Sequence, residues 1–258
     1  MNADGGGQRN LTRNPAFDLS PAWSPDARRI AFVSDRSAGR EIHVINADGR
    51  GHRRLTRNVQ TYDGLPAWSL NGSEIAFMRA RGQCSAGSCK YNEIYVMNVD
   101  GSRQRKLTRN ADDGEAAWSP DGRRIAFRRT RDGAGDIYLM NADSSGKRRL
   151  TRNPALDFAP SWSPNGRKIA FTSDRDGNFE IYVMNADGTG QRNLTRSTVD
   201  ESDPTWSPDG RKIAFTSDRH GAEEIYVMNA DGGGQQNLTR HAGDDSDPDW
   251  SRTLGRKQ

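Results

Sequence analysis

Six acidic residues recur at one fixed position of this 258-residue sequence, and they are its clearest candidates for binding chemistry. Each acid stands three residues before the proline, or in one case the alanine, that precedes a tryptophan. The six are Asp18, Asp63, Asp113, Asp157, Glu201 and Asp245. Carboxylates gathered around one opening would attract a cation such as Ca²⁺, or a lysine or arginine of a partner. The alternative is that each acid caps its own turn by accepting backbone N–H groups.

Further acids accompany the six in the same segments, including Asp203 and Asp247, and add negative charge there. Arginines interleave with aspartates throughout the chain, and the formal net charge is +4. Such a mixed surface is not the strongly basic face typical of nucleic-acid binding, so we predict no nucleic-acid partner.

Signatures of catalysis are absent from the sequence. It has no Gly-x-Ser-x-Gly nucleophile elbow and no phosphate-binding or dinucleotide-binding glycine motif. The four histidines fall at unrelated positions, which disfavours a shared metal site. They are His43, His52, His220 and His241. We therefore predict no catalytic residue, no enzyme activity and no cofactor, and a cation at the six acids stays open.

The tryptophans show how these acids are positioned, because they mark a repeat. They are Trp23, Trp68, Trp118, Trp162, Trp206 and Trp250, spaced by 45, 50, 44, 44 and 44 residues. A fixed period of about 40 to 50 residues built from short β-patterned runs is typical of propeller blades. The sequence thus predicts an all-β propeller with one tryptophan wedged beside each blade.

One repeat reads as four antiparallel strands separated by turns. Residues 204–207 form a short first strand, followed by a Ser-Pro-Asp-Gly turn with proline and glycine at the positions that suit it. Residues 212–217 and 224–229 are β-rich runs that are apolar on both faces, as expected of strands covered on both sides. After an Asn-Ala-Asp-Gly turn, residues 236–239 supply the outermost strand.

These residues carry a family resemblance. The pattern Pro-x-Trp-Ser-Pro-Asp-Gly, Ile-Ala-Phe, Glu-Ile-Tyr-Val-Met-Asn and Leu-Thr resembles the WD40-like Pro-Asp repeats of TolB-type propellers, over essentially the whole chain. The resemblance implies six blades, which agrees with the six tryptophans. It implies little about function, since the family includes periplasmic scaffolds, sensor domains and the gating propellers of prolyl-oligopeptidase-type enzymes.

We predict a single propeller domain over residues 1–258, with a sixth blade that is incomplete and split between the termini. The Met-Asn-Ala-Asp-Gly that opens the chain matches the end of a third strand in other repeats, so the chain is expected to begin within a repeat. The predicted blades are 15–58, 59–110, 111–153, 154–196, 197–240, and 241–258 together with 1–14.

Two cysteines, Cys84 and Cys89, lie in an insertion in the second repeat. No second pair of cysteine or histidine ligands is nearby, so the spacing disfavours zinc, and we predict a disulfide that closes the base of a loop. A disulfide favours a periplasmic or extracellular location. No stretch of about 18 apolar residues is present, so no membrane span is predicted.

The function predicted from the sequence is a non-catalytic scaffold, similar to the TolB propeller. It would bind a protein or peptide, such as an envelope lipoprotein. The binding surface would be the adjoining loops and the mouth of the central channel, where the six acids are expected to gather. The alternative is a fragment of the gating propeller of a prolyl-oligopeptidase-like serine hydrolase whose catalytic domain lies outside this chain. The oligomeric state is left open.

Overall fold

A computed structural model provides the structure of the chain. The described residues are 1–37, 39–58, 61–85, 88–109, 112–131, 133–240 and 243–251. For residues 82–85 and 88–90 the backbone alone is described.

The strands fall into four sets according to their place in a blade. The innermost strands are β1 (Asp18–Trp23), β5 (Tyr62–Trp68), β9 (Asp112–Trp118), β13 (Asp157–Trp162) and β17 (Glu201–Trp206). The second strands are β2 (Arg29–Ser37), β6 (Glu74–Ser85), β10 (Arg124–Arg131), β14 (Lys168–Ser173) and β18 (Lys212–Ser217). The third strands are β3 (Gly39–Asn46), β7 (Ser88–Asn98), β11 (Ala134–Asn141), β15 (Glu180–Asn185) and β19 (Glu224–Asn229). The outermost strands have two residues each: β4 (Arg53–Arg54), β8 (Arg105–Lys106), β12 (Arg148–Arg149), β16 (Arg192–Asn193) and β20 (Gln236–Asn237).

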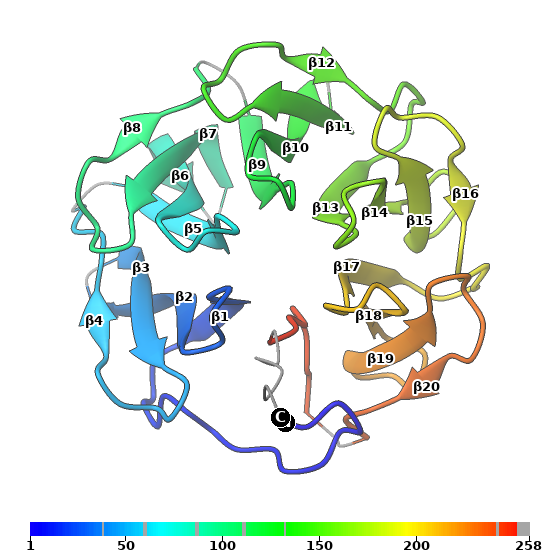
Figure 1. Cartoon of the computed structure of the whole chain (residues 1–258), viewed down its shortest axis with the longest axis horizontal. Coiled ribbons are helices and arrows are strands. Elements are labelled where there is room, and N and C mark those ends of the chain that lie inside the picture. The colour runs from blue at the N-terminus through cyan, green and yellow to red at the C-terminus, as the bar shows by residue number, and fades with distance from the viewer. Residues whose placement is uncertain are drawn as a thin grey trace.

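Each group of four consecutive strands forms one antiparallel sheet in sequence order, and the sheets stand around a central axis (Figure 1). The predicted all-β propeller of four-stranded blades is confirmed. The prediction of six blades is wrong, because the described residues form five sheets. Residues 1–17 and 243–251 lie in the remaining sector, between β17–β20 and β1–β4, and contain no strand. A blade needs two central strands that each pair on both sides. Residues 243–251 lie at the inner edge of this sector and residues 1–17 at its outer edge, and neither segment supplies a central strand.

Apolar contacts between blades form the core. The cluster between the fourth and fifth blades joins Ala170 and Val183 of one blade to Trp206, Ile213 and Phe215 of the next. Phe215 is fully buried, and burying one such side chain stabilises a fold by about 1.5 to 3 kcal/mol. The prediction that tryptophans pack between blades is confirmed for Trp68, Trp118, Trp162 and Trp206, which belong to such clusters.

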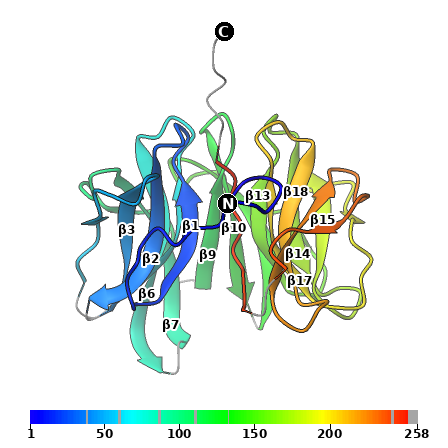
Figure 2. The same cartoon turned by 90° about the horizontal axis from the view of Figure 1, so that it is seen from below.

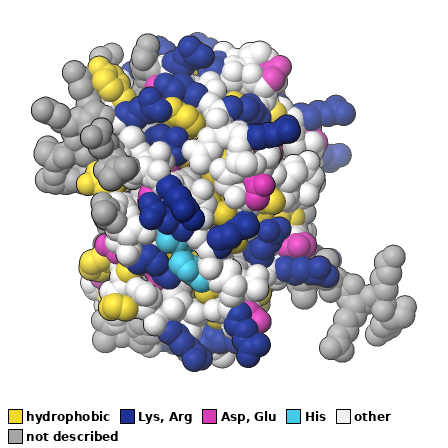
Figure 3. All heavy atoms as spheres, turned by 90° about the vertical axis from the view of Figure 1, so that its left-hand side faces the viewer, with side chains coloured by type: hydrophobic (Ala, Val, Ile, Leu, Met, Phe, Trp, Pro, Cys, Tyr) yellow, Lys and Arg dark blue, Asp and Glu magenta, His cyan; other side chains and the backbone are white. Residues whose placement is uncertain are grey.

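The outer rim adds polar links between neighbouring blades. Arg53 donates a hydrogen bond to the carbonyl of Val99 in the next blade (3.1 Å), and Arg148 donates one to that of Asp187 (3.0 Å). Figure 3 shows lysine and arginine side chains spread over the side of the molecule formed by the first blades. The basic residues of this rim thus take part in ring packing.

The insertion in the second blade lengthens β6 and β7, which extend beyond the other blades (Figure 2). The segment predicted as a loop therefore continues as strand, and the backbone register places Cys84 opposite Cys89. Their side chains lie outside the described residues, so the disulfide stays a prediction. None of the described residues belongs to a helix long and apolar enough to cross a membrane.

Candidate binding site in the central channel

A β-bulge in each innermost strand decides which side chains face the central axis. In β17 the pairing with β18 shifts between Ser202 and Thr205, and Asp203 at the bulge has a φ of 53°. A non-glycine residue in this left-handed region costs about 1 kcal/mol or more, and a bulge redirects its side chain. All six repeats share the conformation, with φ between 49° and 54°, at Ser20, Leu65, Glu115, Ala159, Asp203 and Asp247.

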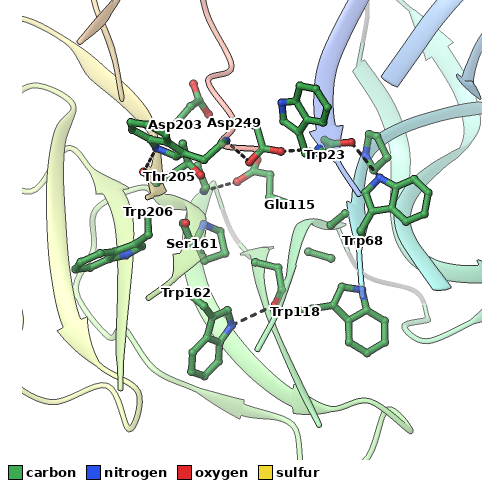
Figure 4. A pocket seen from close by; sticks show the side chains of 18 of the residues that line it. Trp23, Trp68, Glu115, Trp118, Ser161, Trp162, Asp203, Thr205, Trp206 and Asp249 are labelled. Carbon is green, nitrogen blue, oxygen red and sulfur yellow. Dashed lines mark hydrogen bonds between the residues drawn. The ribbon is translucent and has the colours of Figure 1, made fainter. Parts of the chain in front are cut away.

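These six bulge residues line the central channel together with the following prolines and tryptophans. The cavity has a volume of about 350 Å³. Figure 4 shows three carboxylates of the lining, those of Glu115, Asp203 and Asp249, between Trp206 and Trp23. Of the six bulge residues, Ser20, Leu65 and Ala159 are uncharged. The negative charge therefore lies on Glu115, Asp203 and Asp247.

At the bulge positions, two carboxylates fasten neighbouring repeats to one another. Glu115 accepts a hydrogen bond from the backbone N–H of Ala159 (2.6 Å) and forms an ion pair with Arg128 (2.8 Å). Asp247 accepts hydrogen bonds from the backbone N–H of Ser20 (3.2 Å) and from its hydroxyl (3.3 Å). In both cases an acid at the bulge binds the bulge residue of the next repeat. The second pair joins the C-terminal segment to the first blade.

Asp203 differs from these two carboxylates in its surroundings. Asp203 accepts a hydrogen bond from the hydroxyl of the adjacent Ser202 (2.6 Å). Burial raises the pKa of Asp203 to about 6, and the negative charges of Asp247 and Glu115 also raise it, against the opposing effect of the Ser202 hydroxyl. A positive group in the channel would relieve this repulsion and favour the ionised form.

The six acids predicted from the sequence lie two residues before the bulge positions. The structure places five of them in ion pairs with an arginine of the second strand or its end, within their own blade. The pairs are Asp18–Arg36 (2.8 Å), Asp63–Arg79 (2.7 Å), Asp113–Arg129 (2.6 Å), Asp157–Arg175 (3.0 Å) and Glu201–Arg219. The carboxylates of all but Asp18 are fully buried.

The arginines of these pairs are themselves held by aromatic rings. The guanidinium of Arg175 lies 4.4 Å from the ring centre of Tyr182, and that of Arg219 lies 4.3 Å from that of Tyr226. In three of the pairs the arginine also donates to a glutamine at the outer end of the same blade: Arg79 to Gln104 (2.9 Å), Arg175 to Gln191 (2.7 Å) and Arg219 to Gln235 (3.0 Å). In these three blades the acid is thus the inner end of a polar chain that crosses the blade.

The sixth acid, Asp245, lies in the C-terminal segment. Its backbone N–H donates to the carbonyl of Glu223 (2.7 Å), just as that of Glu201 donates to the carbonyl of Phe179 (2.8 Å). The structure therefore keeps the repeat geometry at Asp245 although this segment forms no strand. It does not bring the six carboxylates into one shared opening.

Sequence reasoning included Asp203 and Asp247 as additional charge and missed Glu115. The residue that faces the channel stands directly before the proline of each repeat, or before Ala116 in the third. Its position in the sequence could have marked it, but hydrophobic alternation does not reveal the bulge that turns it inward. Among the described side chains, no three His, Cys, Asp or Glu residues converge as a possible metal-ligand set.

Comparisons with known proteins agree with this architecture. A family model described as the TolB beta propeller domain matches residues 1–92 and 151–255. The Tol-Pal system protein TolB of Anaeromyxobacter dehalogenans (strain 2CP-C) is 38% identical over 105 residues, which are 41% of this chain and 22% of that relative. The chain thus matches about a fifth of the length of this curated relative.

Two solved structures share the fold over most of the chain. The crystal structure of TolB from Acinetobacter baumannii has a TM-score of 0.83 at 24% identity and covers 95% of this chain and 60% of that chain. The structure of putative TolB from Agrobacterium tumefaciens has a TM-score of 0.78 at 26% identity and covers 89% of this chain and 83% of that chain.

Proposed function

Because the chain belongs to the TolB beta propeller domain family, we propose that it is a non-catalytic scaffold that binds a protein or peptide partner through its central channel. The observation that carries this proposal is the channel lining, where Asp203 stands beside Asp247 and Glu115 with a raised pKa. A lysine or arginine of the partner would offset the negative charge of Asp203, whereas Glu115 already forms an ion pair with Arg128. The proposed ligand is therefore a peptide segment with at least one positive side chain.

The cellular setting of this proposal rests on the relatives. Several curated relatives are Tol-Pal system proteins, so we propose that this chain acts in the cell envelope, in the periplasm, with an envelope protein such as a lipoprotein as its partner. A hydrolase propeller remains the alternative function. It has no support beyond a shared fold with peptidase structures at 15 to 16% identity.

A titration calorimetry experiment with a lysine-containing peptide tests the channel. We expect Asp203→Asn to weaken binding by about tenfold, the loss typical of one charged hydrogen-bond partner. The matched control is Asp100→Asn, which removes the same charge at an exposed turn and leaves an oxygen that can still accept from Ser102. Equal weakening by both variants would mean that the peptide senses overall charge, and the channel proposal would then be wrong.

The six acids predicted from the sequence enter the same experiment. Direct contact of these acids with a partner is still a proposal, and the triple variant Asp63→Asn, Asp157→Asn, Asp245→Asn tests it. If this variant folds and binds as the parent does, these acids serve the blades and the partner contacts the bulge residues instead. If it folds and loses binding while Asp203→Asn does not, the partner binds the six acids predicted from the sequence.

A further inference from the structure

Two histidines of the first blade lie against each other although they stand at unrelated positions of the repeat. His43 belongs to β3, and His52 lies in the loop directly before β4. The turn between them is closed by hydrogen bonds from the N–H of Asn46 to the carbonyl of Arg50 (2.9 Å) and from the N–H of Gly49 to the carbonyl of Asn46 (2.8 Å). This turn folds the chain back, so that Nδ1 of His43 and Nε2 of His52 are 2.8 Å apart. The structure thus pairs two imidazoles that the sequence pattern left separate.

The first blade differs from the other four sheets at both of these positions. The other blades have tyrosine at the position of His43, namely Tyr95, Tyr138, Tyr182 and Tyr226. At the position of His52 they have Gln104, Lys147, Gln191 and Gln235. Each of these three glutamines accepts a hydrogen bond from the arginine of its blade's acid–arginine pair. In the first blade the arginine of the pair, Arg36, donates to Asp18 and Ser34, and His52 bonds to His43. His52 therefore has a different partner from the glutamines at its position.

The separation of the two ring nitrogens suits a shared metal ion. Bonds between a metal ion and an imidazole nitrogen are about 2.0 Å long. Two such bonds at a right angle, as in the square-planar geometry typical of Cu(II) or Ni(II), hold the nitrogens about 2.8 Å apart. In this structure a hydrogen bond joins the two nitrogens. An ion beside Nδ1 of His43 therefore requires the other ring, that of His52, to turn its lone pair toward the ion.

The two rings differ in how easily they can turn. His43 is 1% exposed, and its ring lies beside that of Phe32, with the ring centres 5.8 Å apart. His52 is exposed and stands outside the strands. Figure 3 shows histidine side chains at the surface, on the side of the molecule formed by the first blades. The core therefore holds one imidazole in place, while the other can turn outward and admit an ion from solvent.

The charges around the histidine pair are compatible with a divalent ion. The positive groups that act on His43 are Arg36 and Arg54. Arg36 is paired with Asp18 (2.8 Å), and Arg54 is paired with Glu41. These carboxylates offset the repulsion that the arginines would exert on a cation. Nε2 of His43 is buried and has no hydrogen-bond partner among the described residues. Histidines of tight metal sites normally have such a partner, so we expect an ion that exchanges with solvent.

We propose that His43 and His52 together bind a divalent transition-metal ion, with Cu²⁺ held most tightly. Nδ1 of His43 and Nε2 of His52 would be the protein ligands, and water would complete the coordination. Imidazole suits Zn²⁺, Ni²⁺ and Cu²⁺, and the affinity of a given site is highest for Cu²⁺. An ordinary histidine titrates at about pH 6.5, so both rings can act as ligands at about pH 7.5. This site is separate from the central channel and does not depend on the function proposed for it.

Titration calorimetry of the whole chain with Cu²⁺ alone, at about pH 7.5, tests the site. We expect saturable binding, and added Cu²⁺ should raise the melting temperature of the parent. His52→Gln and His43→Tyr each introduce the residue that the fourth blade has at that position, so both variants should fold. Each should weaken Cu²⁺ binding by at least about tenfold, because losing even a hydrogen-bond partner of a metal ligand costs about 10- to 100-fold.

His220→Gln is the matched control, since it removes one imidazole from the same chain at an exposed position of the fifth blade. It should bind Cu²⁺ as the parent does. Electron paramagnetic resonance of the parent's Cu²⁺ complex should detect two coordinated imidazole nitrogens. The proposal is overturned if no saturable binding occurs, if only one imidazole is coordinated, or if His52→Gln binds as tightly as the parent. It is also overturned if binding is lost in His220→Gln instead. Because His52 is exposed, its variant decides the outcome even if His43→Tyr fails to fold.

Discussion

Replacing Asp203 by asparagine should stabilise the protein at neutral pH, by an amount that depends on pH. The pKa of Asp203 is raised from 3.8 to about 6, and each pKa unit corresponds to about 1.4 kcal/mol, so ionisation costs the folded state about 3 kcal/mol. Water in the channel reduces this penalty, and we expect a gain of about 1 to 3 kcal/mol in the free energy of unfolding at pH 8. Asparagine retains the oxygen that accepts from Ser202 and tolerates the left-handed φ well.

The sign of the pH dependence follows from linkage. Because the folded pKa of Asp203 lies above its unfolded value, the carboxyl group contributes stability below about pH 4 that is lost as pH rises through about 6. Asparagine does not titrate, so the advantage of Asp203→Asn should be small at pH 4 and full at pH 8. Urea unfolding of parent and variant at both pH values measures this difference. An advantage of the same size at pH 4 and pH 8 would refute the assignment of a strained carboxylate.

Three further outcomes test the packing of the blades. In chemical denaturation, Gly232→Ala should destabilise the fold by at least about 1 kcal/mol more than Gly221→Ala. Both glycines have a positive φ, but of the two only Gly232 lies where an added Cβ would meet a main-chain oxygen, at 2.4 Å. Arg175→Met should lower the free energy of unfolding by about 3 to 5 kcal/mol, because it leaves the buried carboxylate of Asp157 without its cation. Adding Asp157→Asn to this variant should restore much of the lost stability. If the losses of the two single variants simply add, the pair is not coupled. Burial lowers the pKa of His43 to about 4. The stability of the parent should therefore fall as the pH drops from about 6.5 to about 4. His43→Tyr introduces the tyrosine that the other blades have at this position, and its melting temperature should fall less over the same pH range.

The sequence alone determined the repeating parts of this fold. Tryptophans at a spacing of 44 to 50 residues, turn residues at fixed offsets and central strands that are apolar on both faces predicted stacked four-stranded blades, and the structure has them. These features are local or nearest-neighbour, because each blade contacts only the blades beside it, so a pattern within one period is enough to specify them. The family resemblance rested on the same local pattern.

The number of sheets and the identity of the channel residues were decided by the tertiary structure. Six tryptophans suggested six blades, but a sheet also requires central strands. The terminal segments, residues 1–17 and 243–251, occupy the remaining sector of the ring and contain no strand. In the channel, a bulge in each inner strand places one extra residue between paired positions. Ala159 at the bulge lines the axis, whereas Asp157, two residues earlier, is buried against Arg175. Alternation along a strand cannot reveal such a shift, because the extra residue changes which face every later side chain occupies.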